Sequence, residues 1–510
     1  MSTFHPPVGF PLRDLPSAHA EHSPSSIALR CGDRERSWAE MARATRSLAQ
    51  GMHQRGVGHG DFVSLLLRDG VDIVTAAFAC YQVGAVPQPL STSLAPSELA
   101  AILELTTPAL VVTQDAQSTA ELPGDHPASA VDQLGTDDAA QLPTVISPSW
   151  KAPTSGGSTG RPKIILCGQP AELPAFDAEA WQISGEDRFL MTAPLHHNAP
   201  FATTMTALFH GAEVTLLERF DPEAVLEQIE RHRITWAYLV PTMMRRISSL
   251  PEHQRLSYDL TSLGQLWHCA EPCPAWLKEE WISWLGGERI WELYGGTEAQ
   301  AGCTLSGTEW SAHRGSVGRP RWGEITLFDD QCAEITEPGI PGDVYMRVSP
   351  GSPPAFRYIG AELKEVDGWS TLGDIGEFDT DGYLYLHDRR SDMITVGGVN
   401  VYPAEVESAL TEHPEVLSAA VIGLPEDDLG SSVHAIVQLS TPGQNTYSLS
   451  TEQLQEFLTS RLSRHKRPTS IEFVQTSLRD EAGKVRRAAL RRERLSPEGI
   501  PTEPKEVHYA

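Results

Sequence analysis

Short apolar runs alternate with helix-forming segments along most of the chain, and this alternation limits the fold more than any other feature. Residues 62–67, 214–217 and 235–240 are dense apolar runs of strand length. Helix starts follow two of them, at Asp221-Pro222 and at Pro241. Strands that alternate with helices in this way pair mainly in parallel, so we predict an α/β fold.

Local signals place helices before and after the first of these runs. Ser37 and Glu40 form a capping-box pattern that opens a helix, and Gly56 suits its end. A second helix is expected from Val71 to Gly84. Residues 115–150 are rich in Asp, Gln, Ser, Pro and Ala, and we expect a surface segment with weak structure there.

The last 120 residues have a different character. Pro403 opens a helix, residues 416–422 and 433–439 are typical of strands, and Ser450 caps a further helix. This pattern predicts a compact α+β unit. We therefore expect a large domain over residues 1–390 and a small one over residues 391–510.

Charge is unevenly distributed. The formal net charge of −27 argues against nucleic acid or an anionic membrane as the main partner. Residues 461–494 nevertheless carry a net charge of +7, which leaves −34 on the rest of the chain. This basic segment is either a solvated helix face or a unit that closes over a polyanion.

Cysteine spacing and the N-terminus indicate no metal, export or membrane signal. The seven cysteines form no CxxC pair, which favours reduced thiols over a zinc site. The first residues lack the basic and apolar regions of a signal peptide. The most apolar stretch, residues 73–86, is too short and mixed to span a bilayer. We expect a cytoplasmic protein without a membrane span.

The segment from Thr154 to Lys163 reads TSGGSTGRPK and is the sharpest chemical motif. Its glycines let backbone N–H groups turn around an anion, its hydroxyls add donors, and Lys163 adds a charge. It is not a Walker loop, because GxxxxGK[ST] is absent. A turn of this composition alone is most often a flexible loop, so its meaning depends on the motifs that follow.

Further motifs follow in order: PLHH ending at His197, YGGTE ending at Glu298, LGD ending at Asp374, and the pair Gly483-Lys484. Together with the 154–163 loop they resemble the adenylate-forming superfamily, which includes acyl-CoA ligases, peptide-synthetase adenylation domains and beetle luciferases. The resemblance covers residues 35–490. It implies a large N-terminal α/β domain with mainly parallel sheets and a small mobile C-terminal α+β domain.

The resemblance implies an enzyme that activates a carboxylic acid with ATP and transfers the acyl group to coenzyme A. It assigns Mg²⁺ to Glu298, since a hard cation prefers carboxylate oxygen. It assigns catalysis to Lys484, Glu298, Thr297, Arg389 and His197. It also implies a set of residues that bind the nucleotide, as ATP or as AMP: Ser155, Gly156, Gly157, Ser158, Thr159, Gly160, Lys163, Ala270, Glu271, Tyr294, Gly295, Asp374 and Arg389.

In this family the small domain rotates between the two half-reactions. One pose brings Lys484 to the active site, where it contacts the α-phosphate and the acid. The other pose brings Gly397 and Gly398 to the tunnel for the pantetheine of coenzyme A, where glycines allow close backbone approach. The same glycines also suit an ordinary tight turn.

The acid is expected to occupy a pocket formed by His197, Asn198, Ala199, Trp267, His268 and Gly296. No acidic residue follows the PLHH segment, whereas amino-acid-activating members use an aspartate there. A plain acid is therefore favoured, and fatty, aryl and bulky alicyclic acids all stay open. Coenzyme A is the expected acceptor, with a separate carrier protein as the second choice. The sequence does not indicate an oligomeric state.

Several positions depart from the family pattern: Gly156, Ile164, Leu372, Asp388 and Ser391. Asp388 places an extra carboxylate beside an expected anionic ligand, which is electrostatically unfavourable. An enzyme that catalyses mainly thioester formation from a supplied adenylate therefore stays an alternative. A nucleotide-binding protein without catalysis is a second alternative, disfavoured by the presence of Lys484, Glu298, Asp374 and Arg389. Nothing argues for a luciferase-like oxygenase.

Overall fold

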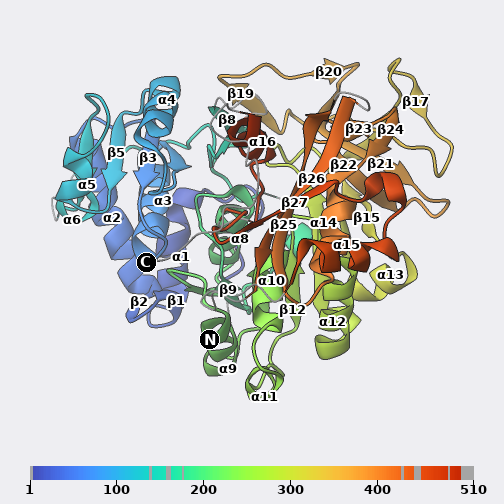
Figure 1. Ribbon diagram of the computed structural model, residues 1–510. Coiled ribbons are helices and arrows are strands. Elements are labelled where there is room, and N and C mark those ends of the chain that lie inside the picture. Colours follow the sequence, from blue (N-terminus) through green and yellow to red (C-terminus); the bar gives the residue numbers. More distant parts are fainter. Residues whose placement is uncertain are drawn as a thin grey trace, which may run out of the picture.

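The computed structural model describes residues 4–136, 141–156, 162–174, 177–426, 430–440, 449–480 and 483–495. A large sheet forms its centre (Figure 1). The strand order is β17 (Glu334–Ile335), β16 (Glu324–Phe328), β18 (Gly342–Arg347), β21 (Trp369–Phe378), β22 (Leu384–Arg389), β15 (Ser316–Trp322), β14 (Gly302–Ser306), β13 (Ile290–Gly295), β12 (Gln265–His268), β11 (Trp236–Leu239), β9 (Arg188–Met191), β10 (Glu213–Leu216), β1 (Ile27–Cys31) and β2 (Arg34–Ser37), with β20 (Glu365–Val366) on β21.

The half of this sheet from β1 to β13 is parallel, whereas the strands from β13 to β22 pair antiparallel. Helices connect the parallel strands, as the alternation of the sequence predicts. These helices and their neighbours are α7 (Asp177–Trp181), α8 (Asn198–Phe209), α9 (Pro222–Arg231), α10 (Pro241–Ser248), α11 (Glu252–Arg255), α12 (Ala275–Leu285) and α13 (Gly307–Ala312).

A second parallel sheet lies towards the N-terminal side of the large domain (Figure 1). Its order is β4 (Val86–Pro89), β3 (Phe62–Leu66), β5 (Leu110–Thr113) and β6 (Ala128–Ala130), and it packs with α1 (Leu15–His22), α2 (Trp38–Gln54), α3 (Val71–Val83), α4 (Pro96–Thr106), α5 (Ala116–Ala120) and α6 (Val131–Leu134). The capping box of Ser37 and Glu40 is confirmed. The expectation of weak structure over residues 115–150 is wrong in part, because β6 pairs with β5.

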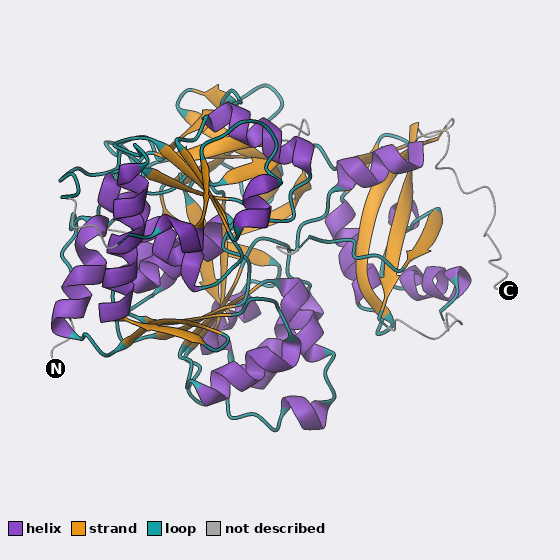
Figure 2. Cartoon of the chain, turned by 90° about the vertical axis from the view of Figure 1, so that its left-hand side faces the viewer, coloured by secondary structure: helices purple, strands orange, loops and turns teal. Residues whose placement is uncertain are grey.

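The small domain contains the elements after β22: β23 (Ile394–Val396), β24 (Val399–Val401), α14 (Pro403–Thr411), β25 (Val416–Glu426), β26 (Gly430–Leu439), α15 (Thr451–Thr459), β27 (Ser470–Val474) and α16 (Arg487–Leu495). Figure 2 shows it as a separate lobe beside the larger one. Its core is an apolar cluster of α14, α15 and the β25–β26–β27 sheet. The predicted architecture of two unequal domains is therefore confirmed.

Glu407 of α14 is a buried carboxylate at the centre of the small domain's charged groups. It accepts a hydrogen bond from the Val421 backbone N–H at 2.8 Å. Arg487 Nη2 lies 2.9 Å from each of its two carboxylate oxygens. Arg479 Nη2 lies 3.4 Å from it. This carboxylate therefore ties α14 and β25 to the segment that carries Lys484.

No helix among the described residues has both the length and the apolar composition needed to cross a membrane. All seven cysteines are free.

Replacing Glu407 by alanine leaves two mostly buried arginines without their shared carboxylate. We expect the free energy of unfolding of the small domain to fall by about 2 kcal/mol, because buried hydrogen bonds to a charged group are lost. Arg487 keeps Asp392 at 2.9 Å and Arg479 keeps Glu271 at 3.0 Å, so neither charge is left without a partner. Hydrogen exchange of the β25 and β26 amides measures this loss. The control is Glu405→Ala, since Glu405 lies on the same helix as Glu407 but forms only an exposed ion pair with Lys466. This substitution should cost less than about 1 kcal/mol. Equal losses in the two variants would contradict the assignment.

Candidate active site

A cleft of about 3650 Å³ lies between the two domains. Its wall includes side chains from both: Lys163, His197, Glu298 and Asp374 of the large domain and Lys484 of the small one. These residues are far apart in the sequence, and the fold brings them to one cavity. The further predicted site residues on this wall are Ser155, Asn198, Ala199, Ala270, Glu271, Tyr294, Gly295, Gly296, Thr297 and Arg389.

The predicted phosphate loop joins two antiparallel strands, β7 (Thr154–Gly156) and β8 (Pro162–Cys167). Ser155 pairs with Lys163 in this hairpin, and both line the cleft. Gly157, Ser158, Thr159 and Gly160 lie outside the described residues. Ile164, a departure from the family pattern, is fully buried in an apolar cluster, so it serves packing and leaves the cleft unchanged.

Glu298 is nearly buried at the cleft wall and is held by two donors on its Oε1 atom. Lys163 Nζ lies 3.2 Å away, and the Tyr358 hydroxyl donates at 2.6 Å. The Lys163 ammonium also lies 3.8 Å from the Tyr358 ring centre. Burial, then the bond to Glu298, raises the pKa of the Tyr358 hydroxyl, so it stays a donor. Tyr358 is on β19 (Phe356–Ile359), and no sequence motif indicates it.

The second oxygen of Glu298, Oε2, accepts no hydrogen bond from a described residue. A Cβ at Gly296 would lie 2.7 Å from this oxygen and 2.8 Å from Leu372, so only glycine fits there. An oriented carboxylate with one oxygen left open fits a hard divalent cation such as Mg²⁺. Leu372, a second departure from the family pattern, backs this glycine.

Asp374 is held by two neighbours at the junction of β21 and β22. The Tyr294 hydroxyl donates to its Oδ2 at 2.7 Å, and Arg389 Nε lies 3.4 Å from its Oδ1. Burial, then the charge of Asp374, raises the pKa of Tyr294 well above its usual value. Asp374 therefore contacts two other residues that are predicted to bind the nucleotide.

Glu271 follows Ala270 in the loop after β12, and it contacts the small domain. It accepts hydrogen bonds from the Thr242 backbone N–H at 2.6 Å and from the Thr242 hydroxyl at 3.0 Å. Arg479 Nη1 of the small domain lies 3.0 Å from its Oε2. A Cβ at Gly483 would lie 2.4 Å from its Oε1, so the small domain approaches as closely as a glycine allows. This interdomain contact was not predicted from the sequence.

Lys484 directly follows this contact and faces the cleft. Its backbone N–H donates to Asp480 Oδ1 at 2.9 Å, which closes the turn before it. Desolvation, then the charge of Arg389, lowers the pKa of its ammonium, while Asp480, Cys269 and Glu298 oppose this shift. The lysine therefore lies among the predicted nucleotide contacts of the large domain.

Gly397 and Gly398 form the exposed turn between β23 and β24, with φ angles of 55° and 83°. They do not line the cleft. The structure therefore has the pose that the resemblance assigns to Lys484, with the glycine turn directed elsewhere.

His197, Asn198 and Ala199 lie at the start of α8 and also line the cleft. Burial, followed by the charges of His196, Lys484 and Arg486, lowers the pKa of His197 well below its usual value, so its ring is neutral. Asn198 Oδ1 accepts a hydrogen bond from Lys151 Nζ at 2.7 Å.

Trp267 and His268 were predicted to line the pocket, and the structure corrects this. Both are fully buried on β12, a central strand, and neither reaches the cleft wall. Trp267 stacks on Trp236 and Trp291 of the neighbouring strands. The chain reaches the cleft only beyond the strand end, at residues 269–273. The aromatic wall instead includes Trp181, Tyr238 and Trp150, which the motifs did not indicate.

Asp388 has a structural function that accounts for its presence. Its Oδ2 accepts a hydrogen bond from the Ala404 backbone N–H at 2.7 Å, which caps the first turn of α14. Its Oδ1 accepts one from the Arg389 backbone N–H at 2.7 Å. Burial raises the pKa of this carboxyl, while the charge of Arg487 opposes the shift. Its charge is therefore directed to a helix terminus.

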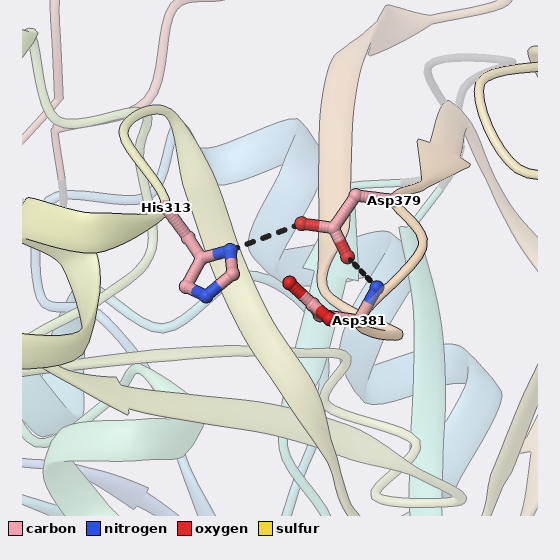
Figure 3. Close-up of side chains that lie close together, drawn as sticks. All are labelled: His313, Asp379 and Asp381. Atoms are coloured by element: carbon pink, nitrogen blue, oxygen red, sulfur yellow. Dashed lines mark hydrogen bonds and ion pairs between the residues drawn. The ribbon is translucent and has the colours of Figure 1, made fainter.

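A histidine–aspartate cluster lies outside the cleft (Figure 3). His313 Nδ1 is 3.0 Å from Asp379 Oδ2, and the backbone N–H groups of Asp381 and Tyr383 donate to Asp379 Oδ1 at 2.9 Å. These bonds use the carboxylate to close the β21–β22 turn. The cluster therefore belongs to the turn and takes no part in the cleft.

Comparison with known proteins agrees with this geometry. Residues 17–351 match the model of the AMP-binding enzyme family, and residues 405–484 match that of the AMP-binding enzyme C-terminal domain. The chain is 32% identical over 497 residues to feruloyl-CoA synthase of an Amycolatopsis species, covering 94% of this chain and 98% of that protein. It is 30% identical over 488 residues to 2-succinylbenzoate–CoA ligase of Bacillus licheniformis, covering 92% and 98%.

The fold is also similar to that of o-succinylbenzoate CoA synthetase from Bacillus subtilis, solved in complex with its acyl-adenylate intermediate. The TM-score is 0.79 at 27% identity, and the match covers 94% of this chain and 97% of that one. A structure of the same enzyme contains ATP and a magnesium ion. The two family models, the relatives over nearly full length and the shared fold show that this chain belongs to the AMP-binding family of adenylate-forming enzymes.

Proposed function

We propose that this protein is an AMP-forming carboxylate–CoA ligase. The observation that carries the proposal is the placement of Lys484 in the same cleft as Lys163, Glu298 and Asp374. A cation from the small domain and polar groups from the large domain thus surround one cavity. The relatives named as CoA ligases support the same reaction class.

In the first half-reaction a carboxylate oxygen of the acid attacks the α-phosphorus of ATP. The bond from this phosphorus to the bridging oxygen breaks, and pyrophosphate leaves with the electron pair. Catalysis of such a step is mainly positioning and charge neutralisation. Ser155 and Lys163 would face the β- and γ-phosphates, and Lys484 the α-phosphate. Glu298 would hold Mg²⁺, which supplies further neutralisation of phosphate charge when bound.

In the second half-reaction the thiol of coenzyme A attacks the acyl carbon, and AMP leaves. The small domain has to rotate to bring Gly397 and Gly398 to the cleft. We place the hinge directly after Arg390, because Arg390 Nε lies 2.6 Å from Asp343 of the large domain. The domain boundary at residues 390 and 391 is therefore part of this proposal.

The acid is proposed to be aryl or similarly bulky, because Trp181, Tyr238 and Met243 line the same cleft as His197. Flat aromatic walls suit a ring better than a flexible chain. A fatty acid is the second choice. A separate carrier protein stays the second choice as acceptor, and the cytoplasmic location stays a prediction.

A paired assay over a panel of acids tests the function. Acid-dependent ATP–pyrophosphate exchange reports the first half-reaction, and thioester formation from a synthetic acyl-adenylate reports the second. A ligase gives both signals with at least one acid. Thioester formation without exchange would select the alternative of a single half-reaction, and neither signal would reject the ligase.

Lys484→Ala is expected to reduce exchange by about 100-fold or more, the usual cost of removing one group that stabilises transition-state charge. Thioester formation from the synthetic adenylate should fall less than about threefold, because the lysine leaves the cleft when the domain rotates. An equal loss in both assays would contradict the assigned function of this lysine.

The exchange rate is expected to fall at alkaline pH with a midpoint below 10.5, the ordinary lysine pKa, because the pKa of Lys484 is lowered. Only the ammonium form neutralises phosphate, so activity is lost as pH rises through that pKa. A pH profile of exchange measures the midpoint. Lys484→Arg keeps its positive charge, so its exchange rate should not show this alkaline decrease. A decrease that persists in the variant would have another origin.

Gly483→Ala is expected to impair exchange about tenfold or more, because its Cβ would collide with Glu271 and push Lys484 from the cleft. Thioester formation should be largely kept. The matched control is Gly430→Ala, which has a similar φ of 78° but no atom within 4 Å of its Cβ. Equal effects in both variants would attribute the loss to backbone strain instead.

A further inference from the structure

The basic segment 461–494 contains two sets of arginines with different surroundings. Arg479, Arg487 and Arg494 each pair with a carboxylate, and they hold the small domain and its interface together. Arg479 and Arg487 also line the cleft, and so do Arg486, Arg491 and Arg492. Within the described part of the chain, the last three form no hydrogen bond or ion pair through their side chains. Their charge is therefore available to a ligand.

Arg486 lies two residues after Lys484, and both residues line the same cleft. Val485, between them, forms an isolated antiparallel bridge with Arg479 and packs against the apolar cluster around Leu478. Side chains at alternate positions of extended backbone point the same way. Val485 packs against the apolar cluster of the small domain, and Lys484 and Arg486 on either side of it both line the cleft.

The two cations also converge on one group of the large domain. The charges of Lys484 and Arg486 both contribute to the lowered pKa of His197, after burial and His196. Arg486 therefore lies close enough to His197 for its charge to act on that ring, in the same cleft as Trp181 and Tyr238.

We propose that Arg486 binds the carboxylate of the incoming acid beside Lys484. This proposal rests on the adenylation reaction proposed above. The guanidinium holds one carboxylate oxygen, and the other oxygen attacks the α-phosphorus while pyrophosphate leaves with the electron pair of the broken bond. Arginine keeps its proton throughout, because its pKa lies far above neutral pH. Once the adenylate forms, no free carboxylate remains, so this contact belongs to the first half-reaction alone.

The test compares Arg486→Gln with wild type in ATP–pyrophosphate exchange, using ferulate, 2-succinylbenzoate, cyclohexanecarboxylate and decanoate as the acids. We expect the KM for the acid to rise about tenfold, the usual effect of losing a hydrogen bond to a charged group. The KM for ATP should change less than about twofold, and thioester formation from the synthetic adenylate should be unchanged. Arg486→Lys should recover part of the affinity, because it restores the charge without the paired donors.

Arg491→Gln is the matched control, since Arg491 also lines the cleft without a partner among the described residues but lies within α16, beyond the segment of Lys484 and Arg486. Its KM for the acid should stay within about twofold of wild type. An unchanged KM for the acid in Arg486→Gln would overturn the proposal. A matching rise in the KM for ATP would assign Arg486 to phosphate, and an equal loss of thioester formation would assign it to structure; either result also overturns it.

Failure of the ligase function itself gives a different result, namely wild-type protein without exchange for any acid. In that case tryptophan fluorescence decides, because Trp181 lines the cleft. Titration with ferulate should then show tighter binding to wild type than to Arg486→Gln. Equal affinities would overturn the proposal.

Discussion

One ion pair between the domains determines where Lys484 lies. Arg479 of the small domain contacts Glu271 of the large domain at 3.0 Å, and Glu271 is itself fixed by two hydrogen bonds from Thr242. Gly483 lies directly against the same carboxylate. The next residue is Lys484, so its entry into the cleft follows from this contact. The loop of Ala270 and Glu271, which the resemblance assigns to the nucleotide, thus also positions Lys484.

The same contact has to break if the domain rotates. Arg479 also lies 3.4 Å from Glu407, a carboxylate of its own domain, so the guanidinium keeps a partner when Glu271 is released. Breaking an ion pair is costly when it leaves a buried charge uncompensated. Release of Glu271 leaves no such charge on the small domain. An interface built on a shared arginine suits a domain that alternates between two poses of similar free energy.

Local patterns predicted the elements that depend on neighbouring residues, such as the strand β3 and the capping box at Ser37. Motif order singled out Lys484, Glu298 and Asp374 as site residues, and the fold brings these three to one cleft. Tyr358 was missed because it reaches Glu298 from 60 residues away in the chain, through the pairing of β19 with β8. Trp267 and His268 were misplaced because the sequence does not show where the apolar strand ends, and only the residues after that end reach the cleft. Asp388 was read as unfavourable because its helix partner is visible only in three dimensions.

The ion pairs of the basic segment determine how much of its positive charge is available in the cleft. The net charge of the basic segment does not measure its field in the cleft, because Arg479, Arg487 and Arg494 are neutralised by carboxylates. What remains for ligands is Lys484 with the unpaired arginines, and all of it belongs to the small domain. On the proposed function, ATP and the acid bring negative charge into the cleft and attract this domain. Departure of pyrophosphate removes much of that charge, which weakens the attraction at the step where the domain has to rotate.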